Sequence, residues 1–140
     1  MSATSTMADV TIPSDLGEAR RLQEEIDGGL QGCAWPDDET FKIRLALEEA
    51  LVNAIKHGNQ MDPEKVVRVG YTITADRFDI RIEDEGPGFN PEDVPDPTLP
   101  ENIEKGSGRG VFLIRELMSA AEYHGRGNVL VMWRVRGEPE

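Results

Sequence analysis

The sequence predicts an α+β fold, a two-layer sandwich in which helices cover one face of a mixed, mostly antiparallel β-sheet. Two stretches before residue 58 carry apolar side chains at helical spacing, whereas residues 67–82 alternate between apolar and polar side chains. An apolar helix and a short hairpin pattern then close the chain. With 140 residues the chain has room for one domain with a single core.

The predicted domain covers residues 9–137, after a flexible tail at 1–8. Residues 10–12 place apolar side chains on either side of a polar one, which indicates a short edge strand. Ser14 has a side chain suited to capping a helix, and we expect that helix over residues 15–30.

A second helix is predicted over residues 37–57, where Gly58 and Asn59 end it. Its core stripe is spaced by three or four residues and consists of Ile43, Leu47, Ala50, Leu51 and Ala54. Residues 67–73 and 78–82 then show the alternation of half-buried strands and predict an antiparallel hairpin.

The last part of the chain begins with a long loop over residues 89–105, which is proline-rich and has no periodicity. A loop of this length in a compact domain is more often a functional lid than a simple connection. A strongly apolar helix is predicted over residues 110–121, and the stretches 122–124 and 129–136 predict a closing hairpin.

Charge and composition narrow the classes of function. The formal net charge of −12 argues against a general nucleic-acid binder, because such proteins need a basic surface. No segment is apolar and long enough to span a bilayer, and the polar start does not resemble a signal peptide. The single cysteine, Cys33, cannot form an internal disulfide, which favours a reducing, cytoplasmic location. We therefore expect neither nucleic acid nor membrane as a direct partner.

Glu49 and Asn53 lie four residues apart on the second predicted helix, so their side chains share one face. That face is nearly opposite the core stripe, and a solvated surface is the simplest interpretation. Two observations favour a ligand instead. Leu45 and Val52 make the same side partly apolar, and asparagine is a poor residue inside a helix unless its side chain binds something.

Asp84, Gly86 and Gly88 follow the second strand of the predicted hairpin. An ordinary turn explains this composition equally well. In a binding site, the Asp84 carboxylate would accept a hydrogen bond from an exocyclic amine, while the glycines let the backbone approach a flat base.

A glycine-rich segment immediately precedes the last predicted helix, and its glycines are Gly106, Gly108 and Gly110. The first amides and the dipole of such a helix attract anions, and Lys105 and Arg109 add positive charge. The spacing matches neither a dinucleotide fingerprint nor a P-loop. A flexible linker is the alternative. Taken together, the three motifs suit ATP, and Mg²⁺ is expected because an acidic chain needs a cation to hold phosphates.

These three motifs resemble the N, G1 and G2 boxes of the ATPase superfamily shared by gyrase, MutL and histidine kinases. Within that superfamily, HGNQ after the first box, DEGPGFNPEDVPDPT and GSGRGVFLIRELM resemble the bacterial anti-sigma-factor serine kinases of partner-switching systems. The resemblance covers roughly residues 10–135 and implies the Bergerat, or histidine-kinase-like ATPase, fold.

The resemblance also implies roles for individual residues. Asn53 would coordinate Mg²⁺, Asp84 would hold the adenine amine with Gly86 and Gly88 lining the base, and Glu49 would act as general base on a hydroxyl. Residues 89–110 would form the ATP lid. Further nucleotide contacts are expected from Phe89, Lys105, Gly106, Ser107, Gly108, Arg109, Gly110 and Asn128.

The first functional hypothesis is an ATP-dependent serine/threonine protein kinase. Its substrate would be a STAS-type antagonist protein, and a sigma factor would be its second partner. Glu49 favours this over a histidine kinase, because activating a hydroxyl requires a base that the usual histidine-kinase box lacks. The alternatives are a nucleotide-binding module that sequesters a partner with little turnover, and a plain α+β scaffold. The resemblance is also compatible with a homodimer.

Overall fold

The computed structural model describes residues 6–88 and 109–137. Within these ranges, one sheet of five strands has the order β1-β2-β3-β5-β4. The strands are β1 (Thr6–Pro13), β2 (Val66–Ile73), β3 (Arg77–Glu83), β4 (Ala120–His124) and β5 (Val129–Val135). Every neighbouring pair among them is antiparallel, so the expectation of a mixed sheet is corrected. The reason is that β2–β3 and β4–β5 are hairpins, and the return through α3 places β5 antiparallel to β3.

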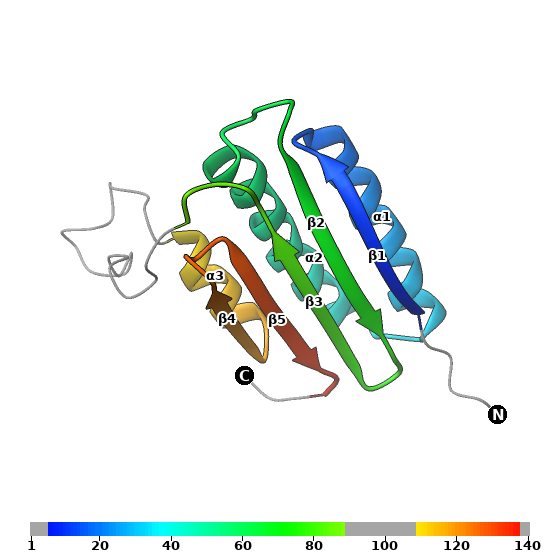
Figure 1. Cartoon of the computed structure of the whole chain (residues 1–140). Coiled ribbons are helices and arrows are strands. Elements are labelled where there is room, and N and C mark those ends of the chain that lie inside the picture. The colour runs from blue at the N-terminus through cyan, green and yellow to red at the C-terminus, as the bar shows by residue number, and fades with distance from the viewer. Residues whose placement is uncertain (1–5, 89–108, 138–140) are drawn as a thin grey trace.

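The helices lie on one face of this sheet, as predicted (Figure 1). They are α1 (Leu16–Gly32), α2 (Asp37–Val52), which continues directly into the π-helix η1 (Asn53–Gly58), and α3 (Arg109–Leu117). In Figure 1, α1 lies behind and beside β1, α2 crosses behind the centre of the sheet, and α3 lies behind β4 and β5. The fold is therefore a two-layer α+β sandwich.

The core lies between the two layers, and the predicted periodicities account for it. The whole predicted stripe of α2 is buried, and β2 and β3 alternate between buried and more exposed residues. The buried strand residues include Val67, Val69, Ile73, Phe78, Ile80 and Ile82, which face the helices. This burial fixes α2 firmly and so determines where its opposite face, with Glu49 and Asn53, is displayed.

Two expectations at the N-terminus are corrected. The strand β1 begins at Thr6, inside the expected tail, because residues 6–8 pair with the last residues of β2. The helix α1 is capped by Asp15, whose carboxylate accepts from Gly17 N (2.7 Å) and Glu18 N (3.2 Å), and not by Ser14. The hydroxyl of Ser14 is used elsewhere, as described below.

The last helix is shorter than predicted, because it ends at Leu117 and Ala120 already belongs to β4. The guanidinium of Arg134 donates from Nη1 to Leu117 O (2.7 Å), which satisfies one of the last carbonyl groups of α3. The main-chain N–H of Ser119 donates to Trp133 O (2.8 Å) and starts the pairing of β4 with β5. The predicted lid loop, residues 89–105, lies outside the described residues. Among the helices that are described, none has the length and apolar character to cross a membrane.

Candidate nucleotide site

The turn after β3, residues 84–88, is held on one side by the connection between β4 and β5. The main-chain N–H of Asp84 donates to Asn128 O (3.0 Å), and the side-chain amide of Asn128 donates to Asp84 O (2.9 Å). Nε of Arg126 donates to Gly86 O (2.7 Å). Asn128 is itself buried. The glycine turn, as we call residues 84–88, is thus fixed through its main chain to the connection between β4 and β5.

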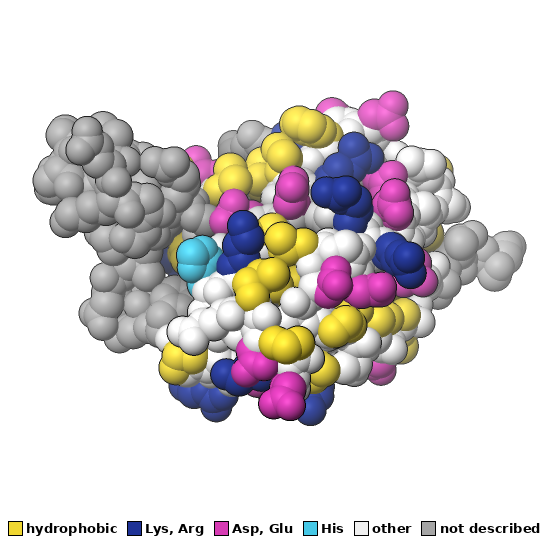
Figure 2. Space-filling view, turned by 90° about the horizontal axis from the view of Figure 1, so that it is seen from above, with side chains coloured by type: hydrophobic (Ala, Val, Ile, Leu, Met, Phe, Trp, Pro, Cys, Tyr) yellow, Lys and Arg dark blue, Asp and Glu magenta, His cyan; other side chains and the backbone are white. Residues whose placement is uncertain are grey.

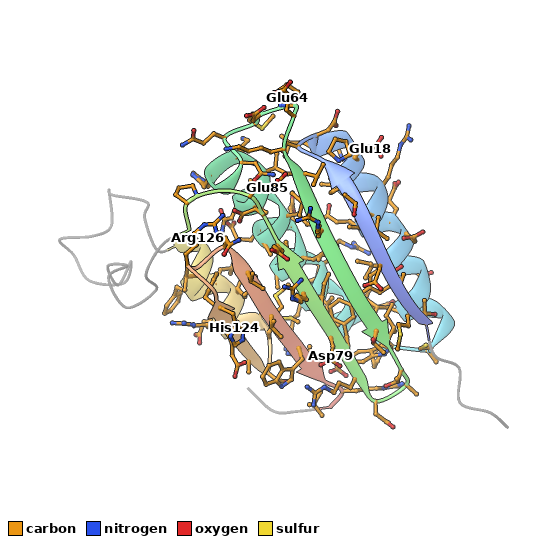
Figure 3. The ribbon with its side chains drawn as sticks, viewed as in Figure 1. Glu18, Glu64, Asp79, Glu85, His124 and Arg126 are labelled. Atoms are coloured by element: carbon orange, nitrogen blue, oxygen red, sulfur yellow. The ribbon has the colours of Figure 1, made fainter. Side chains whose placement is uncertain are left out.

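The other side of the glycine turn is held by residues near η1 and β2. The N–H of Glu85 donates to Oδ1 of Asn59 (2.7 Å), and the carboxylate of Glu85 accepts from the N–H of Val66 (2.6 Å). Figure 3 shows Glu85 and Arg126 at the same end of the sheet, although they come from different connections. The turn is therefore fixed between segments that are distant in sequence.

Close packing explains why this turn contains glycine. A Cβ on Gly86 would overlap the main chain of Gly58, and a Cβ on Gly58 would overlap the Asp84 carboxylate. Gly88 has φ of +76°, in the left-handed region, and a Cβ there would overlap the carbonyl group of Arg126. The glycines were expected to admit a flat base. That role stays a prediction, and what the structure shows is that they let the turn contact η1 on one side and the β4–β5 connection on the other.

The Asp84 carboxylate is the side chain that this turn positions. Its Oδ1 accepts a hydrogen bond from Gly86 N (2.8 Å), and Oδ2 has no hydrogen bond within residues 6–88 and 109–137. Burial is the main cause of a raised Asp84 pKa, and the charge of Glu83 adds to it. The hydrogen bond from Gly86 and the positive charges of Arg126 and Lys65 oppose the rise. One carboxylate oxygen is therefore available to accept a hydrogen bond from an amine-bearing ligand.

Glu49 and Asn53 lie half-buried on the helix that ends against this turn. Neither side chain forms a hydrogen bond or an ion pair with another described residue. The hydroxyl of Tyr123, on β4, has its pKa raised to about 12, mainly by burial. The positive charge of Arg115 opposes this rise and the negative charge of Glu49 adds to it. Glu49 therefore lies within electrostatic reach of Tyr123 on β4.

The helix changes type at Asn53, where the π-helix η1 begins. The N–H of Asn59 donates to Ala54 O (2.8 Å), a five-residue step typical of π geometry. Gln60 and Met61 follow with φ of 54° and 59°, which is uncommon for residues other than glycine. Short π segments often occur at functional sites. Here the segment begins at Asn53 and ends at Gly58, which packs against the glycine turn.

The structure brings part of the predicted site together. Asp84, Gly86, Gly88 and Asn128 form one cluster, and the helix with Glu49 and Asn53 reaches that cluster through Gly58. Arg109 and Gly110 open α3, and the side chain of Arg109 is not among those described. The remaining predicted contacts lie outside the described residues, namely Phe89, Lys105, Gly106, Ser107 and Gly108.

Sequence reasoning missed Gly58, Asn59 and Arg126 as parts of this site. The sequence indicates the end of a helix at Gly58 and Asn59 and includes both in the resemblance through HGNQ, but it assigns them no contact at the site. The available signal was their place directly after the Glu49–Asn53 motif, in the segment HGNQ. Nothing in the local sequence marks Arg126, because its contact with Gly86 joins residues 40 positions apart.

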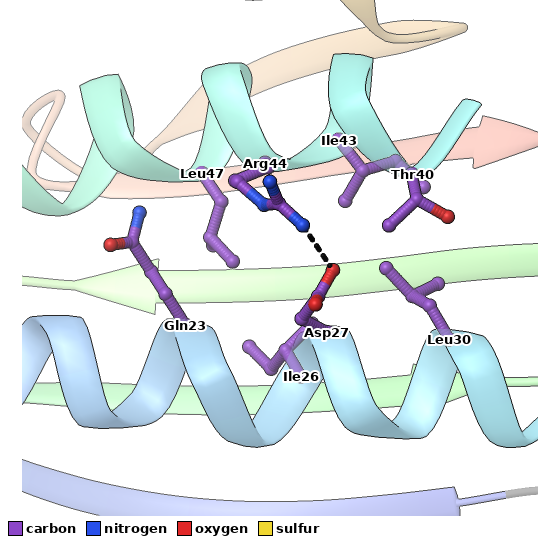
Figure 4. Close-up of a pocket in the computed structure, with 8 residues that line it drawn as sticks. All are labelled: Gln23, Ile26, Asp27, Leu30, Thr40, Ile43, Arg44 and Leu47. Atoms are coloured by element: carbon purple, nitrogen blue, oxygen red, sulfur yellow. Dashed lines mark hydrogen bonds and ion pairs between the residues drawn. The ribbon is translucent and has the colours of Figure 1, made fainter. Parts of the chain in front are cut away.

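Two views show what surrounds the site. Seen from above in Figure 2, Lys and Arg side chains are interspersed with Asp and Glu and form no single basic patch on that face. Figure 4 shows a small pocket between α1 and α2, with an ion pair between Arg44 and Asp27 (2.9 Å). That pocket contains none of the predicted site residues. It is lined by core side chains of the two helices, such as Ile26 and Leu47.

Comparison with known proteins identifies the family. The model of the histidine kinase-like ATPase domain matches residues 12–134. The chain belongs to this family. Its ATPase domain is similar to a serine-protein kinase RsbW of Oceanobacillus iheyensis, with 30% identity over 96 residues, which are 64% of this chain and 61% of that protein. An anti-sigma F factor of Clostridium perfringens is 33% identical over 93 residues, 65% of this chain and 66% of that protein.

These matches span less than two thirds of the length of the two relatives. Among solved structures, the RsbU and RsbW domains of a Mycobacterium tuberculosis protein match with a TM-score of 0.63 and 15% identity. That match covers 94% of this chain and 32% of the other. At this identity it supports the fold alone, and it agrees with the two-layer arrangement described above.

Proposed function

We propose that this ATPase domain binds ATP with Mg²⁺ and phosphorylates a serine or threonine of a STAS-type antagonist protein. We further propose that it binds a sigma factor, and that it acts in the cytoplasm. The observation that carries the proposal is the Asp84 carboxylate, which is fixed by the glycine turn and keeps one oxygen without a described partner. The names of the similar proteins, a serine-protein kinase and an anti-sigma F factor, support the same function.

The residues that would hold the nucleotide follow from this arrangement. Asp84 accepts a hydrogen bond from the adenine amine, beside Gly86 and Gly88, and Asn53 coordinates Mg²⁺ through its amide oxygen. Asn128 donates one amide N–H to Asp84 O and so holds Asp84 in place, and its second N–H remains for the proposed polar contact below adenine. We assign the ATP lid to residues 89–110 and propose contacts from Phe89, Lys105, Gly106, Ser107, Gly108, Arg109 and Gly110.

Glu49 is proposed to accept the proton of the substrate hydroxyl. Bound ATP supplies the phosphoryl group, and Mg²⁺ neutralises charge on its phosphates. Glu49 suits the role because it is half-buried and has no described ion pair that would hold its carboxylate away from a substrate. Positioned general bases contribute about 10²–10⁴-fold to the rate.

The test compares Glu49→Gln with Glu48→Gln. Glu48 is the exposed neighbour on the same helix and provides a matched control. Each protein is mixed with γ-labelled ATP and a STAS-type antagonist from the same organism, and phosphoserine and phosphothreonine are measured. We expect Glu49→Gln to slow transfer by about 10²-fold or more, with ATP affinity retained, and Glu48→Gln to behave as the parent protein.

Unchanged transfer by Glu49→Gln would contradict the role of Glu49 as general base. A protein that binds ATP but labels no antagonist would favour the sequestering module over the kinase. Absence of ATP binding in the parent protein, measured by calorimetry with Mg²⁺, would refute the proposal as a whole.

A further inference from the structure

Asn59 makes three side-chain hydrogen bonds to three different segments, and its exposed fraction is 0%. Nδ2 donates to Val66 O (3.0 Å) and to Oγ of Ser14 (3.0 Å), while Oδ1 accepts from Glu85 N (2.7 Å). A main-chain carbonyl can only accept and a main-chain N–H can only donate. The orientation of this amide is therefore fixed by its partners.

Ser14 extends the network to the junction between β1 and α1. Its hydroxyl donates to Lys65 O (2.8 Å) while accepting from Asn59, and only 7% of Ser14 is exposed. The chain of hydrogen bonds thus runs from Lys65 through Ser14 and Asn59 to Glu85. This explains why the hydroxyl of Ser14 does not cap α1.

The peptide unit that joins Asp84 to Glu85 is held at both of its polar atoms. Its carbonyl oxygen accepts from Nδ2 of Asn128 (2.9 Å), and its N–H donates to Oδ1 of Asn59 (2.7 Å). With both atoms bound, the peptide plane cannot rotate without breaking a part-buried hydrogen bond. Because this plane adjoins the Cα of Asp84, it sets the direction in which the Asp84 side chain leaves the backbone.

We infer that Asn59, supported by Ser14, is a positioning residue that aims the Asp84 carboxylate at the exocyclic amine of the base and so sets the preference for adenine. The inference rests on the proposed function of Asp84. Loss of the bond from Asn59 leaves Glu85 N–H unpaired and the peptide plane held only at its carbonyl oxygen, by Asn128, so the carboxylate is aimed less firmly in advance. Preorganisation of this kind contributes to affinity for the ligand that uses the aimed group.

The ratio of the affinities for ATP and ITP distinguishes a role of Asn59 in positioning Asp84 from a role in stability alone. ATP carries an amine where ITP carries a carbonyl oxygen, which the Asp84 carboxylate repels instead of binding. A variant that is merely less stable binds both nucleotides as before at a temperature where it is folded. A variant with a misdirected Asp84 loses affinity for ATP more than for ITP.

The experiment measures the dissociation constants of Mg-ATP and Mg-ITP for Asn59→Ala, Ser14→Ala and the control Ile26→Val. Circular dichroism establishes that each protein is folded at the temperature used. We expect Asn59→Ala to bind ATP about tenfold more weakly, as for a lost hydrogen bond in a charged site, with a smaller change for ITP. Ser14→Ala, which removes one support of Asn59, should shift the preference in the same direction by about threefold.

Ile26→Val shortens a core side chain of α1 that is 1% exposed, so it lowers stability away from the glycine turn. We expect its ATP-to-ITP preference to equal that of the parent protein. If Asn59→Ala does not fold, Ser14→Ala decides the question. Wild-type preference in the folded variants would overturn the inference while leaving ATP binding intact. Absence of ATP binding in the parent protein would instead refute the proposed function together with this inference.

Discussion

The glycine turn and the helix face with Glu49 and Asn53 contribute to the candidate site in opposite ways. The main chain of the turn is bound by Asn59 on one side and by the β4–β5 connection on the other. Glu49 and Asn53 form no hydrogen bond with another described residue, and the buried core stripe on the opposite side of their helix fixes their position.

This difference predicts which substitutions should change stability and which should change only binding or catalysis. A change in the glycine turn should alter folding and nucleotide binding together, because the same contacts serve both. A change on the helix face should alter binding or chemistry and leave stability nearly unchanged, as surface substitutions usually do. The exchange of Glu49 for Gln proposed above belongs to the second kind.

The largest effect on stability is expected for Gly86→Ala. The added Cβ would overlap the main chain of Gly58, and a backbone obstacle cannot move aside as a flexible side chain can. Overpacking of this kind costs about 1–3 kcal/mol of unfolding free energy, and we expect a value in the upper half of that range. Urea denaturation measures the loss, and ATP binding should weaken in parallel.

Gly28→Ala is the matched control for this exchange. Gly28 lies in α1, and a Cβ there meets nothing within 4 Å. Alanine should therefore raise stability, by up to about 1 kcal/mol, because it favours the helix more than glycine does. The comparison fails if Gly86→Ala proves as stable as the parent protein.

The elements that could be predicted from the sequence are those whose apolar pattern is local. The stripe of α2 and the alternation of β2 and β3 follow from burial of one face, and each was predicted close to its observed bounds. The end of α3 could not be predicted in this way. Arg134 and Trp133, which bind Leu117 and Ser119, come from a strand later in the chain.

The candidate site shows the same division. Asp84 and the Glu49–Asn53 pair could be singled out because residue type and spacing carry their chemistry. Asn59 could not, because its role depends on a π-helical turn and on partners 45 and 26 positions away in the chain. No periodicity in the sequence encodes that arrangement.

The connection between η1 and β2 offers an intermediate test at Met61. This residue has φ of 59°, and its N–H donates to Ile55 O (2.8 Å) at the end of η1. The left-handed conformation costs about 1–2 kcal/mol for a residue with a Cβ, whereas glycine adopts it freely but loses more entropy on folding. We expect Met61→Gly to be more stable than Met61→Ala by about 1 kcal/mol in urea denaturation.

Met61→Ala is the appropriate reference because it removes the half-exposed side chain and keeps the strained backbone. A lower stability of Met61→Gly than of Met61→Ala would show that the left-handed backbone at residue 61 does not destabilise the protein. In that case the connection between η1 and β2 would be an ordinary one.

The smallest effect is expected from the charge of Asp84, and it depends on pH. Because burial raises the pKa of Asp84 in the folded state, the folded protein favours the protonated form more than the unfolded chain does. The stability that protonation contributes is therefore present at low pH and lost as the pH rises through the raised pKa.

Asp84→Asn, which stays neutral, should be slightly more stable than the parent protein at pH 7, by a fraction of a kcal/mol since the group is half-exposed. Urea denaturation across pH should show this advantage shrinking as the solution is acidified toward the pKa of Asp84. An advantage that grows on acidification would mean that Arg126 and Lys65, and not burial, dominate the carboxylate.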